Sequence, residues 1–142
     1  MPSVPMLSAL GLARAIEGGE LIPVQAVDLC ADAIAKREGE VGAFVTLDIE
    51  AARKTAQTPG IKDKPLCGLP VALKDIFDTA DMPTEYGSPI YAGYRPKTDA
   101  SMVALIRRAG GALIGKTVTT EFAHLDPGKT RNPINLAHTP GG

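Results

Sequence analysis

The sequence predicts an α/β fold, on the strength of two patterns of apolar residues. Up to about residue 57 these residues recur at spacings of three and four, which is the period of an amphipathic helix. Further along, short apolar runs at 71–77 and 112–114 flank a helical pattern at 99–109. A strand, a helix and a strand in that order favour parallel pairing of the two strands, around residues 72 and 113.

The first two elements are predicted to be helices bounded by turn residues. Ser8 can cap a helix that Gly18 and Gly19 stop, because a hydroxyl accepts from free N–H groups and glycine tolerates the terminating conformation. Pro23 suits the first position of a second helix, where its missing N–H costs no hydrogen bond.

A strand, a helix and a connector are expected next. The apolar segment 43–47 is a strand candidate, and Asp48 can cap an Ala-rich helix that runs to about Gln57. Residues 58–70 contain three prolines and two glycines, which indicates a connector and not a regular element.

The 71–77 strand carries a lysine at its centre. Alternation places Ala72, Lys74 and Ile76 on one face and Asp75 on the other, where its carboxylate is expected to accept from loop N–H groups. An irregular stretch follows at 78–97, and loops of this length are often lids or binding loops.

The last helix and the last strand complete the prediction. Asp99 is expected to cap a helix whose core face carries Met102, Leu105, Ile106 and Ala109, with cationic side chains in the last turn, where the helix dipole favours them. The strand at 112–114 follows, and the tail from Asp126 has no element of its own.

We expect one domain with three parts. These are a helical part at 1–57, the connector at 58–70 and a core that begins at 71 and runs to 142.

Composition excludes several functional classes. The 142 residues include 15 basic and 16 acidic side chains, so neither nucleic acid nor an anionic membrane is an expected partner. Cys30 and Cys67 are too few for a disulfide framework, and neither they nor His124 and His138 have metal-ligand spacing. We expect no metal and no cofactor. The sequence starts with no basic region followed by an apolar one and has no apolar run long enough for a membrane span, which favours a cytoplasmic protein.

One motif suggests nucleotide binding. Residues 110–117 satisfy the phosphate-loop pattern G-x-x-x-x-G-K-[ST] letter by letter. Such a loop must follow a strand and open a helix, so that backbone N–H groups converge on the phosphates. Here a helix precedes the pattern and its variable positions read as a strand. A phosphate-loop nucleotide binder is therefore the disfavoured alternative.

Several motifs, in order over about residues 65–142, together resemble the amidase signature family, which consists of serine hydrolases of amides. The motifs are Gly68-Leu-Pro-Val-Ala-Leu-Lys74-Asp75, Gly115-Lys116-Thr117, Glu121-Phe122-Ala123, Asn132-Pro133 and Thr139-Pro140-Gly141-Gly142. The resemblance implies the first part of that family's mixed-sheet fold. It also implies a small-molecule amide as substrate and allows a homo-oligomer.

The resemblance assigns Lys74 as the general base of a Ser-cisSer-Lys relay. In the family this lysine deprotonates a bridging serine, which activates the nucleophilic serine. The lysine must be neutral to do so, and desolvation is the physical means. The family's serine-rich stretch follows Pro-Gly-Gly. We therefore expect this chain to hold the lysine and neither serine, and to be inactive alone.

The resemblance also points to weaker candidates. Thr84, Gly87 and Ser88 lie in a loop near the site in the family, and Glu121 and Asn132 match family positions. From the residues alone, Glu121 reads as the start of a short helix and Asn132 as a turn former. A non-catalytic remnant that serves as an interaction module remains the main alternative function.

Overall fold

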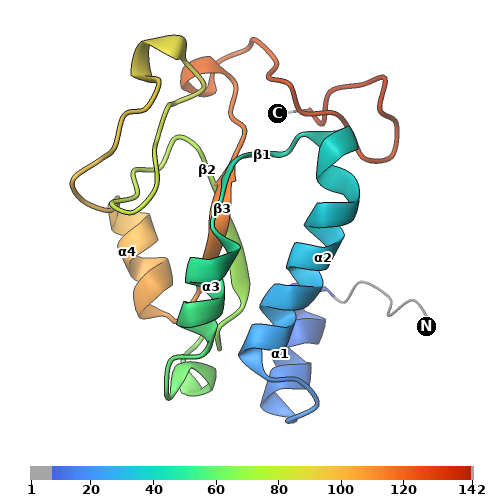
Figure 1. Ribbon diagram of the computed structural model, residues 1–142, viewed down its shortest axis with the longest axis vertical. Helices are drawn as coiled ribbons and strands as arrows, with labels where there is room; N and C mark the ends of the chain where they lie inside the picture. Colours follow the sequence, from blue (N-terminus) through green and yellow to red (C-terminus); the bar gives the residue numbers. More distant parts are fainter. Residues whose placement is uncertain (1–7, 142) are drawn as a thin grey trace.

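The computed structural model describes residues 8–141, which are arranged around a small mixed sheet (Figure 1). The strands are β1 (Phe44–Leu47), β2 (Pro70–Lys74) and β3 (Ala112–Thr117). Their spatial order is β1-β3-β2, with β3 antiparallel to β1 and parallel to β2. The predicted parallel pairing is confirmed, because Val71 lies opposite Leu113. The fold is α/β.

Within the described residues, four α-helices surround the sheet, with α4 on one side and α1 and α2 on the other (Figure 1). They are α1 (Ala9–Glu17), α2 (Pro23–Val41), α3 (Ile49–Ala56) and α4 (Ser101–Arg108). Short 3₁₀ helices occupy Ile61–Asp63, Pro89–Tyr91 and Glu121–Ala123. The predicted caps of α1 and α3 are confirmed, because Ser8 Oγ accepts from Gly11 N at 3.1 Å and Asp48 Oδ1 from Ala51 N at 3.0 Å.

The predicted cap of α4 is wrong. Ala100 is the N-cap residue, and Asp99 accepts instead from Ala80 N at 2.9 Å and from Arg107 Nε at 2.8 Å. The predicted core face is correct only in part, because Ile106 packs against the cluster of Leu73, Val103 and Leu113, whereas Met102 and Leu105 are 40% and 58% exposed. The Asp99 carboxylate bonds to Ala80 and Arg107 and not to the N–H groups at the start of α4. A local sequence pattern does not reveal these partners.

The strand β2 is shorter than predicted and ends at Lys74. The ladder makes one more bond, from Asp75 N to Thr117 O at 2.9 Å, and Phe77 N then closes a turn onto Lys74 O at 3.1 Å. The chain therefore turns as soon as its neighbour β3 ends at Thr117. Ile76 does not extend the face that carries Lys74.

The core packs on both sides of β3. Ala112 and Ile114 pack with α2 and α3 in one cluster, whereas Leu113 packs with Leu73 and with Val103 of α4 in another. This two-sided burial explains why the first half of β3, residues 112–114, reads as continuously apolar.

A change of register between β2 and β3 decides toward which face of the sheet Lys116 points. Val71 lies opposite Leu113, but Ala72 lies opposite Gly115, so Ile114 is one extra residue in β3. From that point Leu73 and Lys116 form one pair, and Lys74 forms the next with Thr117.

Candidate functional site

Lys74 lies at the carboxyl end of β2 and borders a cavity of about 370 Å³. Its partner in the sheet register, Thr117, lines the same cavity. Lys74 is exposed. The remaining lining residues come from three parts of the chain: Ala43, 118–120 and 123–125, and Pro127, Gly128, Thr130, Thr139, Pro140 and Gly141. Of the residues that the structure describes, no serine lines this cavity.

A larger hollow of about 600 Å³ lies between the end of α2 and β1. It is lined by Glu38, Phe44, Lys129 and Arg131 among others, and contains none of the predicted site residues. Volume alone does not make a site, and we place the candidate site at the smaller cavity because Lys74 is there.

The tail of the chain is held against the end of α2, so that its last described residues reach the Lys74 cavity (Figure 1). Arg131 N donates to Val41 O at 2.8 Å, and Thr130 Oγ1 donates to Gly42 O at 2.8 Å. The predicted turn at Asn132 is confirmed, since Asn132 Oδ1 accepts from Ile134 N at 2.9 Å. Asn132 does not line the cavity.

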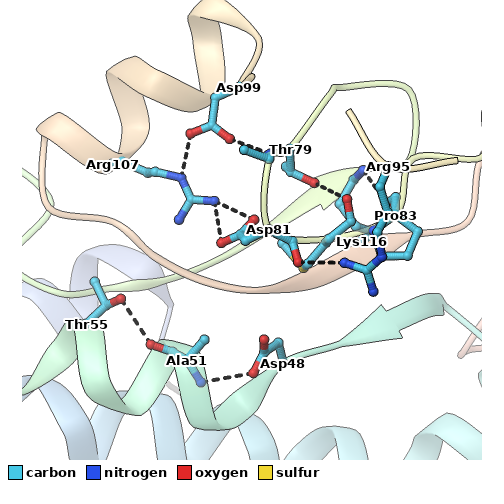
Figure 2. A network of polar contacts seen from close by, with 12 residues as sticks. Asp48, Ala51, Thr55, Thr79, Asp81, Pro83, Arg95, Asp99, Arg107 and Lys116 are labelled. Atoms are coloured by element: carbon cyan, nitrogen blue, oxygen red, sulfur yellow. Dashed lines mark hydrogen bonds and ion pairs between the residues drawn. The ribbon is translucent and has the colours of Figure 1, made fainter. Parts of the chain in front are cut away.

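On the opposite side of the strand end lies a buried ion pair that the sequence analysis missed. Lys116 Nζ is 2.9 Å from Asp75 Oδ1, and the two side chains are 0% and 1% exposed. The same ammonium donates to Thr84 Oγ1 at 2.7 Å. It also donates to Pro83 O at 3.2 Å (Figure 2). Asp75 does accept from a loop N–H group as predicted, from Glu85 N at 3.0 Å.

The sequence held one signal for this pair. Lys116 is a charged residue within a strand that is otherwise buried, and such a residue needs a partner of opposite charge. The phosphate-loop pattern drew attention to the same lysine for a different reason. The expectation that its segment forms a strand is confirmed by β3.

Thr84, a predicted site residue, belongs to this buried network and not to the cavity. It is 0% exposed, and its hydroxyl accepts from Lys116 while donating to Phe77 O at 3.3 Å. The loop before it is tied to α4, because Arg107 binds both carboxylate oxygens of Asp81 at 2.7 Å as well as Asp99 (Figure 2). The first part of the long loop is thus attached to β3 through Lys116 and to α4 through Arg107.

The second part of this loop is tied to the segment that borders the cavity. Ser88 Oγ donates to Glu121 Oε1 at 2.6 Å, so the structure brings these two predicted residues together. Gly87 has φ +67°, and a Cβ there would lie 2.8 Å from Thr119 O. Phe122 donates its N–H to Tyr86 O at 2.8 Å, with φ +49° and +53° respectively at these two residues. Left-handed conformations at non-glycine residues are strained and concentrate at functional sites.

Several groups have raised pKa values. The hydrogen bond that the Tyr86 phenol donates to Asp78 raises the pKa of Tyr86 far above its ordinary value, and burial of the ring adds to the effect. Burial likewise raises the pKa of the Cys30 and Cys67 thiols. Neither cysteine is thereby activated as a nucleophile, because the reactive form is the thiolate.

Residues 8–141 contain neither a membrane-spanning helix nor a cluster of metal-ligating side chains. No helix in that range has both the length and the apolar character needed to cross a bilayer. No group of three or more His, Cys, Asp or Glu side chains there is arranged to hold a metal ion.

Comparison with known proteins identifies the family. A family model described as Amidase matches residues 25–142. The chain belongs to the amidase family. Similar curated proteins include a glutamyl-tRNA(Gln) amidotransferase subunit from Thermobifida fusca, 37% identical over 100% of this chain and 31% of the relative. The corresponding protein of Mycobacterium avium is 39% identical over 94% of this chain and 30% of its own length.

Solved structures of amidases have the same fold. The peptide amidase of Stenotrophomonas maltophilia is 28% identical with a TM-score of 0.83, over 99% of this chain and 32% of that one. A chain from a vestigial complex related to an s-triazine catabolic enzyme, with inhibitor bound, is 27% identical with a TM-score of 0.88, over 96% and 33%. The present chain thus spans about a third of the length of the amidase-family proteins it resembles.

Proposed function

We propose that this chain supplies the general base, Lys74, and one wall of the active site of an amide hydrolase. The single observation that supports the proposal most is that Lys74 and the tail residues Thr139 to Gly141 border one cavity. In the resemblance drawn from the motifs, the family's serines follow directly after this tail. A polypeptide continuing from it would begin at the cavity that Lys74 borders.

The chemistry assigned to Lys74 is proton abstraction. A neutral amine would take the proton of a bridging serine, which would take that of the nucleophilic serine as it attacks the amide carbonyl. The proton would return through the same relay to the amide nitrogen, so that the C–N bond breaks, the amine leaves and an acyl-enzyme remains. Lys74 is exposed in this structure. The desolvation that keeps a lysine neutral would come from the residues that close the cavity in the complete active site.

The other family positions are proposed to shape the site. Ser88 Oγ donates to Glu121 Oε1 at 2.6 Å. This bond attaches the loop to the segment that contributes Ala123 and His124 to the cavity. Gly87 permits the close approach of that loop to Thr119. Asn132 forms a turn that directs the tail. The substrate class is a carboxylic amide of small-molecule size, and all 142 residues are proposed to belong to one amidase domain.

A fluorophosphonate probe, which labels activated serines, tests this function. The 142-residue chain should show no labelled serine. A longer polypeptide that continues into the family's serine-rich stretch should be labelled at one serine of that stretch, and Lys74→Ala should reduce the labelling rate by at least about 100-fold. Lys62→Ala, which removes an exposed lysine on the connector, is the matched control.

Stoichiometric labelling of Ser88 in the 142-residue chain would contradict the assignment. So would a longer polypeptide that keeps full reactivity without Lys74. If the chain proves to act without any such continuation, through binding to another protein, the interaction-module alternative is favoured.

A further inference from the structure

Asp75 and Lys116 are the two charged side chains among the described residues that are almost wholly buried. A buried ion pair is weak evidence for stability, because desolvation of two charges offsets their attraction. A role other than stability is therefore worth seeking. Asp75 directly follows the proposed general base, and the pair lies on the other side of the same strand end.

Asp75 makes hydrogen bonds through three of its polar atoms and contacts Lys116 through the fourth, Oδ1. Its N–H donates to Thr117 O at 2.9 Å, and its carbonyl accepts from Tyr86 N at 3.1 Å. Its Oδ2 accepts from Glu85 N at 3.0 Å, and its Oδ1 has no partner except the ammonium of Lys116. The backbone after Lys74 is thereby attached to β3 on one side and to the long loop on the other.

The extra residue in β3 decides which way Lys116 points. After Ile114 the register pairs Lys116 with Leu73, which packs in the cluster beside α4, and Thr117 with Lys74. Lys116 therefore lies on the buried side, and Lys74 lies with Thr117 on the cavity side. Two lysines on neighbouring strands occupy opposite faces of the sheet.

We propose that Lys116 is a positioning residue for Lys74: its buried ammonium holds and neutralises Asp75, so that Lys74 faces the cavity with no free carboxylate beside it. The catalytic meaning of this inference rests on the proposed function.

The charge argument follows from the neighbours of Lys74. A free carboxylate next to an amine favours the protonated, unreactive form of the amine. The ammonium of Lys116, 2.9 Å from Asp75 Oδ1, compensates that carboxylate. Other titratable residues lie around this strand end. His124 lines the same cavity, Glu85 and Tyr86 donate their backbone N–H groups to Asp75, and the Asp78 carboxylate accepts from the Tyr86 phenol.

The test uses the 142-residue chain and needs no hydrolase activity. The chain is treated with N-hydroxysuccinimidyl acetate at one pH below the range in which an ordinary lysine titrates, where the neutral fraction of the amine sets the rate. The acetylation of Lys74 is measured by peptide mass spectrometry relative to Lys36, an exposed lysine of α2. Three variants are compared with the parent chain: Asp75→Asn, Lys116→Met and the double variant.

The expected changes have opposite signs. Asp75→Asn removes the carboxylate while Lys116 keeps Thr84 Oγ1 and Pro83 O as acceptors, so Lys74 should react about threefold faster. Lys116→Met leaves the carboxylate uncompensated, so Lys74 should react about threefold more slowly. The double variant removes both charges and should return to within about twofold of the parent rate.

A purely structural role predicts a different pattern. Loosening of the fold would accelerate Lys74 in all three variants or change none of them, and either result overturns the proposal. Asp75→Asn is nearly isosteric and keeps an acceptor for Glu85 N, so it serves as the decisive variant if Lys116→Met does not fold. A folded Asp75→Asn chain in which Lys74 reacts no faster also overturns it. Because no serine is involved, failure here is distinguishable from failure of the proposed hydrolase function.

Discussion

The two faces of the sheet end carry two lysines with different surroundings. On the closed face, Lys116 has a carboxylate, a hydroxyl and a carbonyl within hydrogen-bonding distance and is 0% exposed. On the open face, Lys74 is exposed and borders a cavity of about 370 Å³. They lie on adjacent strands, one register position apart. The apolar character of a strand therefore does not decide whether a lysine within it is buried or exposed. The polar groups on the face of the sheet to which the lysine points decide whether it is buried.

The largest expected change in stability comes from removing the ammonium of Lys116 on the closed face. Lys116→Met leaves the Asp75 carboxylate buried and unpaired, which should lower the free energy of unfolding by about 3–5 kcal/mol. Urea denaturation followed by circular dichroism measures the change. The double variant Lys116→Met with Asp75→Asn should recover more than half of the loss. A loss below about 1 kcal/mol in the single variant would show that the pair is not desolvated in solution.

The chemical accessibility of the two lysines should differ almost as strongly. In the folded chain, Lys116 should be acetylated at least about 100-fold more slowly than Lys74, because a wholly buried amine reacts only through opening of the structure. Peptide mass spectrometry measures both rates. In concentrated urea the two rates should converge. Equal rates without denaturant would contradict the burial of Lys116.

A smaller effect is expected from the hydroxyl that joins Lys116 to the loop. Thr84→Val removes the acceptor for the ammonium and the donor to Phe77 O while it keeps the shape, and should cost about 1–2 kcal/mol of unfolding free energy. Thr84→Ser keeps the hydroxyl and is the matched control. If the serine variant loses as much as the valine variant, the methyl group and not the hydrogen bonds accounts for the effect.

The smallest effect should come from the open face. Lys74→Met removes an exposed side chain that has no ion-pair partner among the described residues, so the free energy of unfolding should change by less than about 0.5 kcal/mol. Urea denaturation of this variant and of Lys116→Met, side by side, gives the contrast directly. A loss of more than about 1 kcal/mol would mean that Lys74 makes contacts on the cavity side that this structure does not contain.

Local chemistry determined the elements that were predicted correctly. Ser8 and Asp48 cap their helices because each bonds to an N–H group three residues ahead. Pro23 opens α2 because a missing N–H is harmless at a helix start. The parallel pairing of β2 with β3 follows from the order of strand, helix and strand. The motifs singled out Lys74 and indicated the amidase family, which the family comparison confirmed. They did not place Lys74 at a strand end, because the strand was expected to run on to residue 77 and β2 ends at Lys74.

Tertiary structure alone decided which way each lysine faces. Simple alternation along β3 would put Lys116 on the side of Ile114, but the extra residue moves it to the side of Leu73. Gly115 makes this possible, because it adopts φ +155° and a Cβ there would lie 2.2 Å from Thr46 O of β1. The bulge thus depends on the close approach of a third strand, distant in sequence. Since the side-chain period of a strand is two, a shift of one residue exchanges the faces. Asp75 and Lys116, which are 41 positions apart, could become partners only through that shift.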